Sequence, residues 1–140
     1  MNIVFDTAAA KIWVDGNVPF VFSSFVDWPL RDGEFKKIES TYFNFLDIIK
    51  NEFGEVYSIC DISEVAEMPH EMTTWLFEDC LERQLKVGVK RMAFIYPKGA
   101  GKDLLPYTTS PYFKYLSFHE TKESAIMELD RYRTPKVAIL

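Results

Sequence analysis

Three consecutive segments, VYSICDIS (56–63), PHEMTTWLFEDCLERQLKVG (69–88) and RMAFIYP (91–97), decide the fold class of this chain. The first and the third are short, apolar and β-prone, and the first carries apolar residues on both faces, as is typical of a strand covered on both sides. The segment between them has a proline in its first turn and ends at Gly88, and these are start and stop signals of a helix. The order predicts a βαβ unit with a right-handed crossover.

The residues before this unit predict a hairpin and a helix. Three β-prone runs, with a turn signal at Asp15-Gly16-Asn17, cover 3–5, 11–14 and 18–25. Apolar residues then recur at spacings of three and four over 35–53, which predicts an amphipathic helix that ends at Gly54.

The residues after the unit predict one more strand and one more helix. A short helical turn is expected at 102–105 and a strand at 116–118. Thr121 is expected to cap a helix over 122–133 whose inward residues are Ala125, Ile126, Leu129 and Tyr132. We therefore predict a single α/β domain over 1–140. Its mixed β-sheet starts with an N-terminal hairpin, continues with βα units, and has helices packed mainly on one side.

Composition narrows the classes of function. The chain has 140 residues, of which 48% are hydrophobic and 26% charged, as in an ordinary globular domain. A net charge of −5 with scattered basic residues argues against a nucleic-acid partner. No apolar run reaches the roughly 20 residues of a membrane span, and the start resembles no signal peptide. Cys60 and Cys80 have no disulfide or metal-ligand spacing, so we expect no cofactor or metal and a cytoplasmic location.

Several short strings resemble the STAS-like superfamily, named for sulfate transporters and anti-sigma-factor antagonists, and in particular its small stand-alone bacterial members. The strings that carry the resemblance are Phe25 with Glu34-Phe35-Lys36 after a polar break, Cys60-Asp61-Ile62, Trp75, the run from Gly88 to Phe94, and Phe118 to Glu120 with Ser124-Ala125-Ile126.

The resemblance implies a non-enzymatic regulatory or binding module that acts through a protein partner. In anti-sigma antagonists the switch is a serine in an Asp-Ser-Ser-Gly string, at the start of the helix after the central strand. Residues 64–71 occupy that place here and contain neither serine nor glycine. The serine phosphoswitch is therefore not expected in this chain.

A polar group of residues after the central strand is a candidate site of another kind. Asp61 ends that strand, at the sheet edge where open α/β sheets bind ligands. His70 follows at a helix start, and with Glu67 and Glu71 it could form a small acid–base or metal site. The alternative is that Asp61 binds loop N–H groups and that His70 is solvated, which makes an enzyme the less favoured hypothesis.

The surplus of aromatic residues, 16% of the chain, predicts a pocket wall or a dimer patch besides core packing. The candidate ligand-binding aromatics are Trp28, Tyr107, Tyr112 and Phe113, with Phe25 and Tyr115 beside them. They support a second hypothesis, a protein that binds a small apolar ligand or lipid. The apolar tail over 137–140 adds the expectation of a homodimer.

Overall fold

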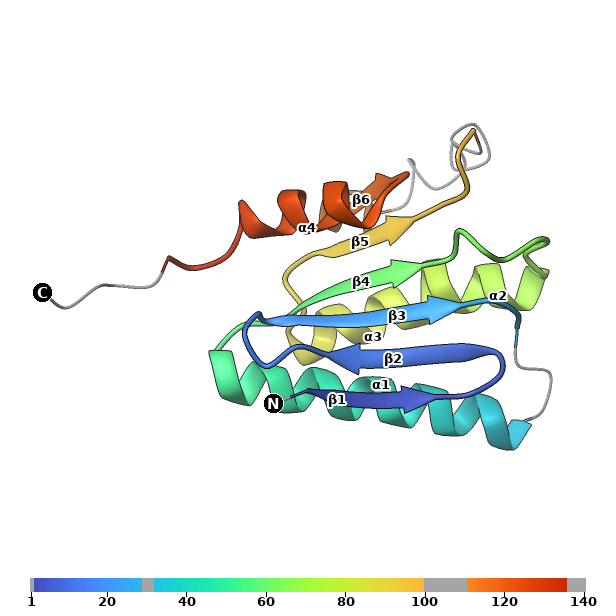
Figure 1. Cartoon of the computed structure of the whole chain (residues 1–140), viewed down its shortest axis with the longest axis horizontal. Helices are drawn as coiled ribbons and strands as arrows, with labels where there is room; N and C mark the ends of the chain where they lie inside the picture. The colour runs from blue at the N-terminus through green and yellow to red at the C-terminus, as the bar shows by residue number, and fades with distance from the viewer. Residues whose placement is uncertain (1, 29–31, 100–110, 136–140) are drawn as a thin grey trace, which may run out of the picture.

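The structure is a computed structural model, and it describes residues 2–28, 32–99 and 111–135 (Figure 1). One sheet holds six strands in the order β1-β2-β3-β4-β5-β6. The strands are β1 (Ile3–Asp6), β2 (Ala10–Val14), β3 (Phe20–Phe25), β4 (Tyr57–Asp61), β5 (Met92–Ile95) and β6 (Leu116–His119). The helices are α1 (Asp32–Phe53), α2 (His70–Thr74), the π-helix η1 (Trp75–Asp79), α3 (Cys80–Val87), the short 3₁₀ turn η3 (Phe113–Tyr115) and α4 (Lys122–Asp130). The segments α2, η1 and α3 follow one another without a break.

The strand directions confirm the predicted mixed sheet. The pairs β1–β2 and β2–β3 are antiparallel, while β3–β4, β4–β5 and β5–β6 are parallel. The chain steps from β3 to β4 to β5 in one direction across the sheet, through α1 and then through α2–η1–α3. Because such crossovers are right-handed, two steps in one direction place both helices on the same face.

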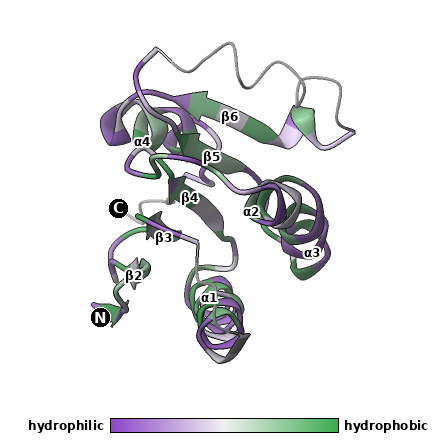
Figure 2. Cartoon of the chain, turned by 90° about the vertical axis from the view of Figure 1, so that its right-hand side faces the viewer, coloured by the Kyte–Doolittle hydropathy of each residue, from purple (hydrophilic) through white to green (hydrophobic). Residues whose placement is uncertain are grey.

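The two faces of the sheet carry cores of different size. α1 and α2–η1–α3 cover one face and α4 covers the other, so the helices lie mainly on one side as expected (Figure 2). The larger core lies under α1 and α2–η1–α3. The smaller core lies under α4, where Ala125 and Leu129 pack on Phe20, Tyr57 and Ile59.

Most of the local signals act as predicted. Gly54 and Gly88 follow α1 and α3 with φ of 77° and 100°, and the Thr121 side chain accepts a hydrogen bond from the Ser124 N–H. One inward assignment is wrong, because α4 ends at Asp130 and Tyr132, in the turn beyond it, is 44% exposed. The turn expected at 102–105 lies outside the described residues.

Gly88 provides a test of the helix stop. An alanine there would hold a left-handed conformation and crowd the Lys50 side chain, so Gly88→Ala should lower the free energy of unfolding by about 1–2 kcal/mol. Gly33→Ala is the matched control, because a Cβ there meets no atom within 4 Å and the site lies in the first turn of α1. Urea unfolding measures both, and equal losses would contradict the assignment.

Candidate functional site

The floor of the candidate site is a row of side chains across the middle of the sheet. Ile12, Ser23, Cys60 and Phe94 occupy paired positions on β2, β3, β4 and β5 and point to the face that α1 and α2–η1–α3 cover. Ser58 lies two residues before Cys60 on the same face. The side chains of Ser23, Ser58 and Cys60 are small, and they leave space that a branched aliphatic side chain would fill.

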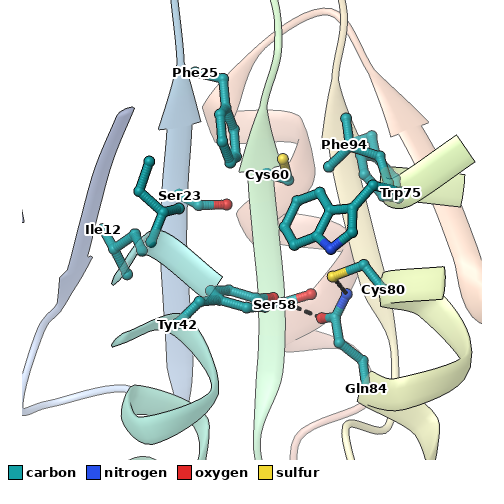
Figure 3. Close-up of a pocket in the computed structure, with 12 residues that line it drawn as sticks. Ile12, Ser23, Phe25, Tyr42, Ser58, Cys60, Trp75, Cys80, Gln84 and Phe94 are labelled. Carbon is teal, nitrogen blue, oxygen red and sulfur yellow. Dashed lines mark hydrogen bonds between the residues drawn. The ribbon is translucent and has the colours of Figure 1, made fainter. Parts of the chain in front are cut away.

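The roof of the site comes from the two covering helices. Tyr42 from α1 and Trp75, Cys80 and Gln84 from η1 and α3 point into the space (Figure 3). Ile38 of α1 and Leu76 of η1 also line it. The space between roof and floor is a cavity of about 10 Å³, about the room that one water molecule needs. All its lining residues are buried.

The π-helix positions the roof. The Cys80 N–H donates to the Trp75 carbonyl, five residues back, which fits one extra residue into the turn. Residues five apart, such as Trp75 and Cys80 or Leu76 and Leu81, therefore face the interior together. π-Turns inside helices are rare and often lie at functional sites.

Polar groups meet in this apolar interior. The Tyr42 hydroxyl donates to Gln84 Oε1 at 2.6 Å, and Gln84 Nε2 donates to Cys80 Sγ at 3.3 Å (Figure 3). Ser23 and Ser58 bring two more hydroxyls to the same cavity. Buried polar groups are costly without partners, so this network makes the packing of α1 against α3 specific.

Burial keeps the ionisable groups of the cavity neutral. It raises the pKa of the Cys60 thiol from 9.0 to about 12, with an opposing hydrogen bond from Ser23. Burial and the neighbouring Cys60 also raise the pKa of Cys80. The pKa of Tyr42 is raised well above 10.0 by burial and then by Cys80, against a hydrogen bond with Ser58.

An outer rim closes the cavity between the helices. Trp75 Nε1 donates to Glu39 Oε2 at 2.8 Å, and Arg83 pairs with Glu39 at 3.4 Å across the α1–α3 seam. The Arg83 guanidinium also lies 3.9 Å from the centre of the Phe43 ring. Glu39 therefore connects α1 to both η1 and α3 near the surface.

Aromatic rings pack beside the Trp75 indole. Trp28 and Phe35 lie 5.8 Å and 5.3 Å from it, and Phe25, which also lines the cavity, lies 6.2 Å away. Among the predicted aromatics, Trp28 is thus placed next to a cavity residue. The described lining does not include Tyr112 or Phe113, and Phe113 is exposed. Tyr107 lies outside the described residues.

The polar candidates at and after the end of β4 form no metal site in the described structure. Asp61 accepts hydrogen bonds from the N–H and the hydroxyl of Ser63, at 2.9 Å and 2.6 Å, which is an ordinary turn contact. His70 is exposed at the start of α2. Within 2–28, 32–99 and 111–135 no group of three or more histidine, cysteine, aspartate or glutamate side chains could hold a metal ion.

Sequence reasoning missed Tyr42, Gln84, Ser23 and Ser58 as site residues. Tyr42 fits the apolar spacing over 35–53, and its hydroxyl finds its partner 42 positions away, so nothing local distinguishes it. Gln84 did carry a signal, since it is a polar residue one helical turn after the buried Cys80. The serines carried none, because small residues are common in strands and their neighbours depend on the packed helices.

Comparisons of the chain with protein-family models, with curated proteins and with solved structures found no match. In the part of the chain that the structure describes, no helix has the length and apolar character needed to cross a membrane.

The hydrogen bond between Tyr42 and Gln84 can be tested by a double-mutant cycle. Tyr42→Phe leaves Gln84 Oε1 without its donor, so we expect a loss of about 1–3 kcal/mol in the free energy of unfolding. Tyr42→Phe with Gln84→Leu should cost less than the sum of the single changes. Tyr96→Phe, at a half-buried tyrosine outside the cavity, is the control. Additive single effects in urea unfolding would contradict a shared network.

Thiol modification can report how the helices open. Cys60 and Cys80 are buried, so a thiol reagent at pH 8 should react slowly until α2–η1–α3 moves away. Glu39→Ala removes the acceptor of Trp75 and the partner of Arg83, and loss of about 1 kcal/mol there would speed opening about fivefold. Glu82→Ala breaks a pair with Lys86 on the exposed side of α3 and should change nothing. Equal modification rates in both variants would show that the Glu39 contacts do not hold the helices together.

The raised pKa values also predict alkaline sensitivity. In the unfolded chain the Cys60 thiol ionises near 9.0, whereas in the folded protein it stays neutral to about 12. The neutral Cys60 thiol therefore does not lower the free energy of unfolding below pH 9. Above pH 9 the free energy of unfolding declines, because the thiol of the unfolded chain loses its proton before that of the folded protein does. Urea unfolding of Cys60→Ala between pH 7 and 10 should show a shallower decline than the wild type, and parallel curves would contradict the shift.

Proposed function

We propose that the protein is a non-enzymatic STAS-like module that binds a small, largely apolar molecule between the sheet and the helices α1 and α2–η1–α3. The observation that carries this proposal is the buried cavity in which Tyr42, Gln84 and two serines converge among apolar side chains. Small-molecule sites typically combine an apolar lining with a few placed polar groups. Trp28 and its aromatic neighbours lie at one end of this space.

Binding requires the roof to move. A cavity of about 10 Å³ holds no more than one water molecule, whereas ligand pockets measure about 300–1,000 Å³. The π-helix favours such a movement, since its widened turn can return to α-helical geometry as the roof shifts. The Glu39 contacts at the rim would then control the exchange between closed and open forms.

The lining indicates the chemical class of the ligand. The described lining residues carry no charged side chain, and burying an unpaired charge is very unfavourable. The Tyr42 hydroxyl and the Gln84 amide can each exchange their present hydrogen bond for one to a ligand. We therefore expect a neutral, mainly aliphatic or aromatic molecule that has one hydroxyl or carbonyl group.

A regulatory role through a protein partner remains a second prediction, motivated by the STAS-like resemblance. A cytoplasmic location fits it, because reducing conditions preserve free Cys60 and Cys80. The homodimer also remains a prediction, since the tail on which it depends lies outside the described residues. An enzyme centred on Asp61 and His70 is the least favoured proposal, because Asp61 already binds Ser63.

Titration with 1-octanol, followed by amide chemical shifts, tests the ligand-binding proposal. Octanol has a neutral apolar chain and one hydroxyl, so we expect saturable shifts at Tyr42, Ser58 and Gln84. Gln84→Leu should weaken binding about fivefold or more through the lost hydrogen bond.

Thr73→Val is the matched control, because it changes a polar residue of the same helix outside the cavity. It should bind octanol as the wild type does. Native mass spectrometry of the freshly purified protein complements the titration by looking for a retained apolar molecule. Scattered, unsaturable shifts together with a clean ligand-free mass would overturn the proposal.

A further inference from the structure

A second hollow lies at the end of the sheet where β4, β5 and β6 begin, because its lining residues other than Tyr132 stand at or just before the first residues of these strands. Its volume is about 400 Å³, which is the size of a small organic molecule. Among the described residues, its lining comprises three tyrosines and three basic residues, namely Tyr57, Tyr115, Tyr132, Lys90, Arg91 and Lys114. Such a concentration of cations is unexpected in a chain with a net charge of −5.

The cations of this hollow are only weakly neutralised. Lys90 Nζ lies 3.8 Å from Glu55, and Arg91 Nη2 lies 4.0 Å from Glu128, both near the limit for an ion pair. Within the described chain, Lys114 has no acidic partner, and its amine lies 5.1 Å from the Tyr115 ring centre. These groups are thus available to a stronger anion.

Arg91 provides an independent observation. Its Nη1 donates to the Lys114 carbonyl at 3.0 Å, and its guanidinium lies 4.0 Å from the centre of the Tyr132 ring. Its buried Nε–H finds no acceptor among the described residues. Buried donors without an acceptor are rare in proteins, and an unbound ligand is one recognised cause.

Tyr132 is placed to uncover this donor. Its carbonyl is held by the Tyr57 hydroxyl at 2.6 Å, so the backbone of the turn after α4 is fixed. Tyr132 is 44% exposed, and its ring stacks over the Arg91 guanidinium. A rotation of this ring would open Arg91 to the hollow without moving the backbone.

We propose that this hollow is a binding site for a phosphate monoester. The phosphoryl oxygens would contact Lys114, Lys90 and Arg91, and the organic part would lie against the rings of Tyr115 and Tyr132. A dianion matches several neighbouring cations better than a carboxylate does, and the planar guanidinium suits phosphate oxygens. The site differs from the interior cavity, since the two share none of their described lining residues.

Titration of the full chain with phenyl phosphate, followed by amide chemical shifts, tests this site. We expect saturable shifts at Lys90, Arg91 and Lys114, with weaker binding of benzoate and of inorganic phosphate. Lys114→Glu should weaken the phenyl phosphate complex by about tenfold or more. Because Lys114 is exposed, this variant should fold, and Lys114→Gln should fall between it and the wild type.

Lys37→Glu is the matched control, since it makes the same charge change on the exposed side of α1. It should leave the affinity for phenyl phosphate within about twofold of the wild type, because charges beyond about 10 Å are screened at 0.1 M salt. Equal weakening in both variants, or benzoate binding as tightly as phenyl phosphate, would overturn the proposal. The absence of saturable shifts at the three cations would do the same.

Discussion

The right-handed crossover is the constraint on which the rest of this structure depends. Because the chain moves in the same direction from β3 to β4 and from β4 to β5, α1 and α2–η1–α3 must share one face of the sheet. Two helices on one face meet along a seam, and the strands under that seam carry Ser23, Ser58 and Cys60. The candidate cavity is the place where small side chains of the sheet lie beneath this seam.

The seam is filled by polar as well as apolar groups. Aliphatic residues alone could fill this space without any hydrogen bond. The Tyr42–Gln84 hydrogen bond instead fixes how α1 packs against α3, and it does so only while both partners are present. The π-turn at Trp75 and the Glu39 contacts at the rim lie at the same seam, and both would change if the helices moved apart. The smaller core under α4 provides a contrast, since Ala125 and Leu129 close it with apolar contacts.

Local signals were sufficient for the elements but not for the site. Glycine after a helix and threonine before one act through their own neighbours, so Gly54, Gly88 and Thr121 could be assigned from the sequence. The prediction that Tyr132 faces inward is wrong because α4 ends at Asp130, before the helical periodicity of the sequence does. Asp61 and His70 have residue types that are common in active sites, yet Asp61 is bound within its own turn.

The sequence by itself determined the α/β class, the order of the elements, the mixed sheet and the ends of α1 and α3, because these depend on periodicity and on caps a few residues long. Only the tertiary structure decided which polar groups meet. Tyr42 and Gln84 are 42 positions apart, and Arg91 and Lys114 are 23 positions apart. Such pairs depend on helix crossing and on strand register, which arise from the packing of the whole chain and leave no local pattern.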